Sequence, residues 1–152
     1  MPSRDERGSA LLLFPAAVLI MVALAAMAVD SSIAFLAQRE LTNATAAAAN
    51  DAATEALSDR SFYQGDRLEL SASAVEAVAV DRVFQLVDQT RHHDLAVQAD
   101  ALPPTGAGCS WTVRVVASSK VDELFGRALP GSRAVAVRAQ STASPRQGNS
   151  TC

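Results

Sequence analysis

Residues 9–29 read Ser9-Ala-Leu-Leu-Leu-Phe-Pro-Ala-Ala-Val-Leu-Ile-Met-Val-Ala-Leu-Ala-Ala-Met-Ala-Val29, and this uncharged apolar stretch decides the fold of the chain. At about 1.5 Å of rise per residue, a helix of this length spans about 30 Å, the thickness of the hydrocarbon core of a bilayer. Pro15 falls within the first two turns, where its missing N–H disturbs few helical hydrogen bonds. The stretch therefore predicts one transmembrane helix near the N-terminus.

Charges on the two sides of the apolar stretch predict its direction. Arg4 and Arg7 precede it, Asp30 follows it directly, and the next basic residue is Arg39. Because positive residues beside a membrane span favour the cytoplasmic side, we expect residues 1–8 in the cytoplasm and the chain from Asp30 onward outside. Arg4, Arg7 and Asp30 are the expected topology anchors. Asp30 either marks the membrane interface or pairs with a partner helix.

The same stretch has a competing interpretation as a cleaved secretory signal. Ala26-Met27-Ala28 matches the small-residue cleavage pattern that follows the apolar part of such signals. The apolar run is longer than that of an ordinary signal, and no Gly or Pro interrupts the chain between Pro15 and Gly65. We therefore expect an uncleaved anchor, with cleavage after Ala28 as the alternative.

The helical pattern continues past the apolar stretch. Residues 31–57 are dominated by alanine, accompanied by leucine, glutamate, glutamine and arginine, all strong helix formers. Apolar side chains recur there every three or four residues and form one narrow stripe, at Ile33, Leu36, Ala37, Leu41, Ala44, Ala48 and Ala52. A continuous helix from about Ser9 to about Leu57 would be about 75 Å long. Its outer half needs a packing partner, which is its own domain, another copy or another protein.

An ordered series of landmarks accompanies this helix. Arg7-Gly8 precedes the span, Ala28-Val29-Asp30 ends it, and Phe35 follows. The segment Gln38-Arg39-Glu40-Leu41-Thr42-Asn43-Ala44 then leads into an Ala/Asn/Asp run through Ala53. This series resembles the N-terminal segment of the TadE/TadG-like proteins of Flp (Tad) pilus assembly, and the resemblance covers about the first third of the chain.

The chain departs from those proteins in two respects. Their pilin-like members are cut after a Gly and carry a Glu at the fifth mature position, whereas a cut after Gly8 would place Leu13 there. This sequence also lacks the long von Willebrand-like C-terminal region of large TadG proteins. The resemblance is therefore closer to the uncleaved TadG-like branch.

The resemblance implies a structural or assembly component of a Tad/Flp-type pilus or related secretion apparatus. Such a protein would be single-pass in the bacterial cytoplasmic membrane, with the membrane and other subunits of the apparatus as its partners. The alanine-rich stripe permits the close helix–helix approach that such contacts need. We expect this packing seam at Ile33, Leu36, Leu41, Ala44 and Ala48. The alternative function is a secreted or anchored small binding domain unrelated to pili.

The remaining chain divides into an exported helix extension at residues 30–58, a small domain at 59–143 and a polar tail at 144–152. Ser71 or Ser73 opens a second helix, in which Ser73 and Glu76 fit a capping box. Its expected core stripe runs to about Thr90 and comprises Val75, Val78, Val83, Leu86 and Val87.

Three segments of this domain predict antiparallel strands. These are Leu95–Leu102, Cys109–Ala117 and Ala134–Ala139, and in the second of them Trp111, Val113 and Val115 should face the core. Lys120–Gly126 predicts one or two helical turns. The expected fold is therefore membrane-anchored α+β, with a long helix, a second helix and a small antiparallel sheet of about three strands.

Few residues suggest chemistry. A net charge of −3 gives no basic field for nucleic acid. With no phosphate-binding Gly loop and no recognisable Ser/His/Asp spacing, we expect no enzyme, small-molecule substrate or cofactor. Adjacent side chains on a strand point to opposite faces, so we expect His92-His93-Asp94 to be a solvated loop and not a metal site. Cys109 and Cys152 either form one disulfide in an exported domain or remain free thiols.

Overall fold

The fold is seen in a computed structural model of the chain, which describes residues 7–57, 70–104, 110–126 and 134–145, with side chains from Leu13 onward. The elements in order are α1 (Arg7–Glu55), α3 (Ala72–Leu86), β1 (His92–Leu102), β2 (Thr112–Val121) and β3 (Val135–Ala143). The expected α+β layout of a long helix, a second helix and a three-stranded antiparallel sheet is confirmed.

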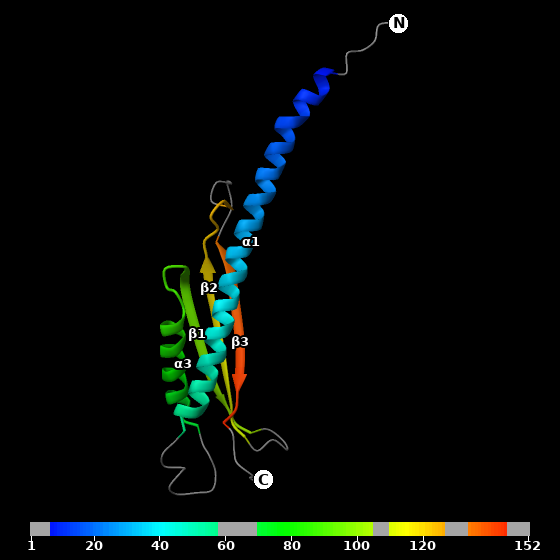
Figure 1. Cartoon of the computed structure of the whole chain (residues 1–152). Helices are drawn as coiled ribbons and strands as arrows, with labels where there is room; N and C mark the ends of the chain where they lie inside the picture. The colour runs from blue at the N-terminus through cyan, green and yellow to red at the C-terminus, as the bar shows by residue number, and fades with distance from the viewer. Residues whose placement is uncertain (1–6, 58–69, 105–109, 127–133, 146–152) are drawn as a thin grey trace, which may run out of the picture.

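Helix α1 is one unbroken element of 49 residues, about 74 Å long at the usual helical rise. Its first half projects away from the rest of the molecule, and its second half runs along the sheet (Figure 1). Pro15 lies inside the helix without ending it. Among the described residues, this is the one helix long and apolar enough to span a membrane, and no residue of its most apolar part is buried.

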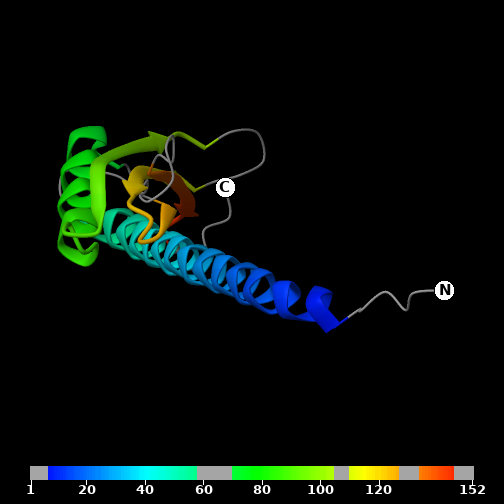
Figure 2. The same cartoon turned by 90° about the horizontal axis from the view of Figure 1, so that it is seen from above.

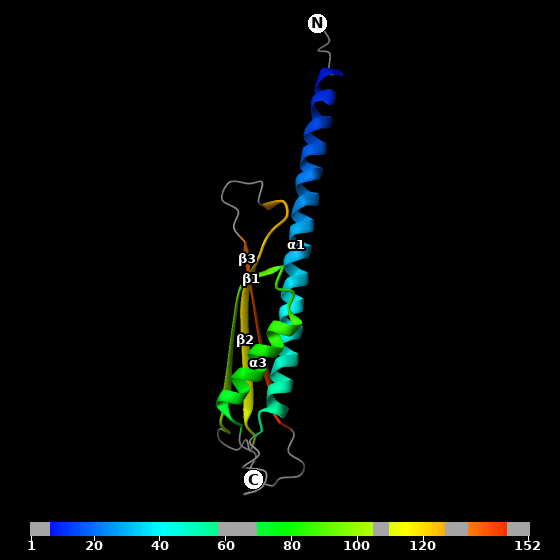
Figure 3. The same ribbon diagram turned by 90° about the vertical axis from the view of Figure 1, so that its left-hand side faces the viewer.

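The three strands form a sheet in the order β1-β2-β3, with both neighbouring pairs antiparallel. Both helices cover one face of this sheet, as the two perpendicular views show (Figure 2, Figure 3). Helix α1 lies against β2 and β3, and α3 lies against β1 and α1. The domain therefore has two layers, and the second half of α1 is part of its helical layer.

The core lies between the helices and the sheet. Strand β2 alternates as the sequence predicts, with Val113, Val115 and Ala117 buried and Trp111 half-buried just before the strand. The facing surface of α1 is built almost wholly from alanine, at Ala37, Ala44, Ala48, Ala49, Ala52, Ala53 and Ala56. Such small side chains bring the helix backbone close to the sheet, so α1 packs tightly without large residues.

The second helix begins at one of its two expected positions, but it ends at Leu86, before the expected Thr90. Its N-cap is Ser71, whose side chain makes no capping hydrogen bond, so the capping box at Ser73 and Glu76 is wrong. Ser71 Oγ instead lies 3.1 Å from Ser73 Oγ. The hydroxyl that would cap the helix therefore contacts another side chain. Leu86 is half exposed, and Ala79 takes a core position between Val75 and Val83.

The helical turns expected at Lys120–Gly126 are also wrong. Lys120 and Val121 belong to β2, and residues 122–125 contain no α-helix. Val121 pairs with both β1 and β3, opposite His92 and Val135. This double pairing holds the segment in the sheet beyond the point at which its sequence stops alternating.

Candidate functional site

A cluster of hydrogen bonds joins α1 to the segment that follows β2. Asp30 lies on α1 where its apolar stretch ends, and its carboxylate accepts three backbone N–H groups. Leu124 N and Phe125 N donate to Oδ1 at 2.9 and 3.0 Å, and Gly126 N donates to Oδ2 at 2.9 Å. We call Asp30 with residues 124–126 the Asp30 clamp. Three charge-assisted hydrogen bonds from one loop to one carboxylate fix both the position and the direction of that loop.

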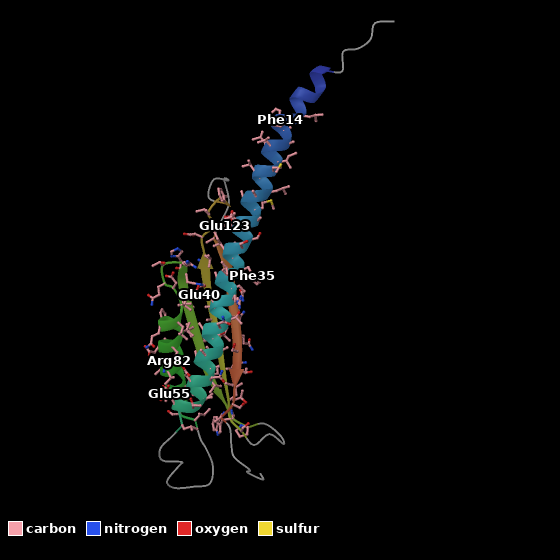
Figure 4. The ribbon with its side chains drawn as sticks, viewed as in Figure 1. Phe14, Phe35, Glu40, Glu55, Arg82 and Glu123 are labelled. Carbon is pink, nitrogen blue, oxygen red and sulfur yellow. The ribbon has the colours of Figure 1, made fainter. Side chains whose placement is uncertain are left out.

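Gly126, at the last position of the clamp, lies close to the side chain of Glu123. A Cβ built on Gly126 would overlap the carboxylate of Glu123 and would lie 2.9 Å from the Glu123 Cβ. Because Gly126 has no side chain, the backbone turns back past Glu123 and directs its N–H to Asp30. Glu123 lies beside α1 near the upper end of the domain (Figure 4).

A groove of about 590 Å³ lies beside the Asp30 clamp. One wall comes from the end of the apolar stretch of α1, at Ala23, Ala26 and Met27. The opposite wall comes from the domain, at Phe125 and Val135. The groove therefore lies where the exposed half of α1 meets the folded domain, and its walls are largely apolar.

Most of the predicted packing seam lies inside the chain's own domain and not on its surface. Leu41, Ala44 and Ala48 are buried in the chain's own core, so the expectation that they face a partner helix is wrong. Ile33 is partly buried against the same core. Leu36 alone of the five is exposed. The stripe of small residues, which favours close packing of helices, lets the chain's own sheet and second helix pack closely against α1.

Gln38 ties the same helix to the sheet edge. Its Nε2 donates to the carbonyl oxygen of Arg138 at 2.7 Å, and the Arg138 N–H donates to Gln38 Oε1 at 3.3 Å. Since β3 is an outer strand of the described sheet, these are backbone groups that no neighbouring strand uses. One side-chain amide thereby stands in for a strand partner at this point of the edge.

A second polar cluster joins α1, β1 and β2 inside the domain. Ser119 Oγ lies 2.7 Å from His92 Nδ1, and His92 Nε2 lies 3.8 Å from Glu40 Oε2. Glu40 Oε1 also accepts the backbone N–H of Asp88 at 2.7 Å, just past α3. The structure thus assembles a serine, a histidine and a carboxylate that no sequence spacing indicated. Ser119 and His92 are both buried, so the hydroxyl lies out of reach of a substrate, and the cluster holds the layers together.

A β-bulge brings His92 into this cluster. Between the pairs His93–Lys120 and Ala96–Ser118, β1 has one residue more than β2, and Asp94 there has a φ of 52°. The extra residue reverses the alternation, so that His92 shares the inner face with Leu95 and the strand bends. The prediction of a solvated loop at His92 is therefore wrong, because the bulge could not be read from the alternation.

His93 and Asp94 lie on the outer face, where each has a charged partner. His93 Nε2 lies 3.2 Å from Asp122 Oδ2. The Lys120 ammonium donates to Asp94 Oδ2 at 2.7 Å, and this hydrogen bond holds the pKa of the Asp94 carboxyl below its usual value. The two imidazoles point to opposite faces, as expected for neighbours on a strand.

An exposed ion cluster joins the two helices at the far end of the domain. Arg82 on α3 lies 3.0 Å from Asp51 Oδ2 and 3.1 Å from Glu55 Oε1, both on α1 (Figure 4). These contacts, led by the hydrogen bond to Glu55, raise the pKa of the Arg82 guanidinium. Because all three side chains are well exposed, the cluster adds little to stability.

Several predicted residues carry no side-chain description. Arg4, Cys109 and Cys152 lie outside the described residues, so the topology role of Arg4 and the disulfide remain predictions. Arg7 is the first residue of α1. Of the three topology anchors, Asp30 alone has a described side chain, and its carboxylate binds its own domain.

The partners of Asp30 were missed because they lie 94 to 96 positions away along the chain. The one local signal is a glycine directly after two large apolar residues, in Leu124-Phe125-Gly126.

Comparison with protein-family models, with curated proteins and with solved structures finds no match for this chain.

Proposed function

We propose that this protein is a single-pass membrane component of a Tad/Flp-type pilus or related secretion apparatus, in which it acts as a structural subunit or assembly factor. The observation that carries the proposal is the division of α1. Its first half is apolar and exposed, while its second half is packed into the core of a folded domain. One rigid element thus joins a bilayer to an external contact surface.

The exposure of residues 13–29 supports an anchor. Large apolar side chains such as Leu19, Ile20 and Met21 are well exposed all around this part of α1, and Phe14 projects from it (Figure 4). A helix that is apolar on every side needs a non-aqueous environment. The arginines before it and Asp30 after it favour an N-terminus in the cytoplasm and a domain on the outer side.

Phe35 and Leu36 are the surface that we assign to contact with other subunits. They are exposed on α1, just beyond Asp30, whereas the alanine face of the same helix is buried in the domain. Phe35 lies on the side of α1 away from α3 (Figure 4). An exposed aromatic beside an exposed leucine, close to the membrane, is a suitable anchor for a neighbouring subunit.

Photo-crosslinking in the native cells tests this proposal. We would replace Phe35 by p-benzoylphenylalanine, irradiate, and identify the crosslinked proteins by mass spectrometry. The matched control carries the same amino acid in place of Phe84, an exposed aromatic on α3. We expect crosslinks from position 35 to other subunits of a pilus or secretion apparatus.

The alternative of a secreted binding domain predicts a different result. A mature polypeptide that starts at Val29 and is recovered from the medium would contradict the anchor. Crosslinks at position 35 that are absent, or that reach only proteins outside any such apparatus, would contradict the assembly role while leaving the anchor intact.

A further inference from the structure

We propose that the loop held by the Asp30 clamp is a second membrane contact, and that the groove beside it receives the acyl chain of a zwitterionic phospholipid. The proposal rests on the proposed membrane anchor and adds to it. In this arrangement the domain is seated on the outer leaflet at residues 124–126, in addition to being tethered by α1.

The depth of the groove along α1 supports this contact. Ala23 lies about 10 Å before Asp30 along the helix axis, well inside the apolar stretch, and it lines the groove together with Phe125 of the domain. If α1 is in the bilayer up to Val29, the loop bonded to Asp30 lies at the outer edge of the hydrocarbon, and the groove extends from there to Ala23, about 9 Å deeper. The groove is thus continuous with the lipid-facing surface of the span.

The side chains of the loop suit that level. Leu124 is 64% exposed and Phe125 is 46% exposed, although both follow a strand whose inner-face apolar residues are buried. Large apolar groups placed beside a membrane span gain free energy by entering the interface, and aromatic residues are enriched there. The loop therefore presents to lipid the residues that would be unfavourable in water.

The Asp30 clamp removes the main obstacle to such a contact. Backbone N–H groups that lack a partner are costly next to hydrocarbon, where no water replaces the hydrogen bond. The carboxylate of Asp30 takes up the N–H groups of Leu124, Phe125 and Gly126 together. In return, the three donors lower the cost of keeping a carboxylate at the membrane surface.

The charges beside the groove favour a zwitterionic lipid over an anionic lipid or a second copy of the chain. Asp30 and Glu123 both line it, so an anionic headgroup would be repelled and an ammonium group attracted. A second copy that docked symmetrically through this groove would bring the Asp30 and Glu123 carboxylates of both copies together. An acyl chain with a zwitterionic headgroup fills the apolar walls without this repulsion.

Fluorescence quenching by brominated lipid tests the proposal on the full chain. Trp111 is the only tryptophan, so the Trp111→Phe variant provides a silent background. Into it we would place Phe125→Trp in the loop, Val22→Trp in the span and Leu86→Trp on α3. Each protein is reconstituted in phosphatidylcholine vesicles with and without bromine on the acyl chains. We expect strong quenching at positions 22 and 125, and none at 86.

The three positions separate the outcomes. Quenching at 22 without quenching at 125 overturns the loop contact and leaves the anchor standing, while no quenching at 22 overturns both. Quenching at 86 as well as at 125 overturns a contact specific to the loop. Emission at 125 that changes on dilution of the protein in lipid, and not with bromine, assigns the groove to a second copy. Adding Asp30→Ala should reduce quenching at 125 and leave quenching at 22 unchanged.

Discussion

Asp30 Oδ2 accepts the backbone N–H of Gly126 at 2.9 Å, although the two residues lie 96 positions apart in the chain. The bond joins the last turn of the apolar stretch to the loop after β2. With the two bonds from Leu124 and Phe125, it gives the domain a second connection to the apolar half of α1, in addition to the continuous helix itself.

Removing the Asp30 carboxylate should release the loop. In Asp30→Ala, the amide hydrogens of residues 124–126 lose their acceptor, and we expect them to exchange with solvent much faster than in the wild type. The overall stability should fall by about 1–3 kcal/mol, the usual cost of leaving backbone N–H groups without an acceptor. Hydrogen exchange measured by mass spectrometry in detergent micelles checks this.

The control for that experiment is Glu55→Ala, which removes an exposed partner of Arg82 far from the loop. Exchange at residues 124–126 should be the same in this variant as in the wild type. Equal protection of these amides in Asp30→Ala and the wild type would show that the clamp does not hold the loop.

Gly126→Ala should weaken the same junction for a steric reason. The added Cβ meets the side chain of Glu123, so either the carboxylate or the backbone has to move. We expect faster exchange at residues 124–126 and a loss of about 1–3 kcal/mol, the usual range for overpacking. The double variant with Glu123→Ala should recover part of the loss; an unchanged Gly126→Ala protein would contradict the close approach.

Ala48→Leu should destabilise the domain itself. Ala48 is fully buried where α1 meets the sheet, and the larger side chain would push the two layers apart, at a cost of about 1–3 kcal/mol. Ala77→Leu makes the same change at an exposed position of α3 and should leave stability nearly unchanged. Thermal unfolding followed by the fluorescence of Trp111 compares the two; equal melting temperatures would contradict a core position for Ala48.

Two serines of β2 offer a matched test of the buried cluster. Ser119→Ala removes the hydroxyl next to His92 Nδ1 and leaves a buried ring nitrogen without its partner, which costs about 1–3 kcal/mol. Ser118→Ala, one residue earlier on the outer face, should change stability by less than about 0.5 kcal/mol. Denaturant unfolding of both variants measures the difference, and similar losses would count against the His92–Ser119 contact.

The stability of the turn after α3 should depend on pH through Asp88. The hydroxyl and then the N–H of Thr90 donate to Asp88 Oδ1, which lowers the pKa of this carboxyl from its usual value of 3.8. A lowered pKa in the folded state adds stability above the unfolded value, and that stability is lost as the pH falls through the folded value. Thr90→Val should therefore be less stable than the wild type at pH 7, with the difference vanishing in acid. A constant difference between pH 7 and pH 2 would refute the assignment.

The sequence predicts best what depends on neighbouring residues. The uninterrupted run of helix formers gives the limits of α1 to within two residues, from Ser9–Leu57 expected to Arg7–Glu55 found. The alternation around Val113 and Val115 likewise predicts β2 and its buried face. In each case a repeated local pattern matches the period of one element.

What the sequence could not predict depends on contacts between distant residues or on a single irregular one. The stripe at Leu41, Ala44 and Ala48 shows that α1 packs closely, but nothing local says that its partner is its own sheet. The bulge at Asp94 moves His92 from the outer face to the inner face, and one residue in a left-handed conformation leaves no trace in the pattern of apolar residues.

The continuity of α1 has a mechanical consequence. No break separates its apolar half from the half that carries Leu41, Ala44 and Ala48, and the Asp30 clamp braces the point where a hinge would otherwise form. The sheet and the helix therefore move together as one rigid body. A change in the tilt of residues 13–29 rotates the strands by the same angle, and a pull on the domain is transmitted along the helix axis to its apolar end.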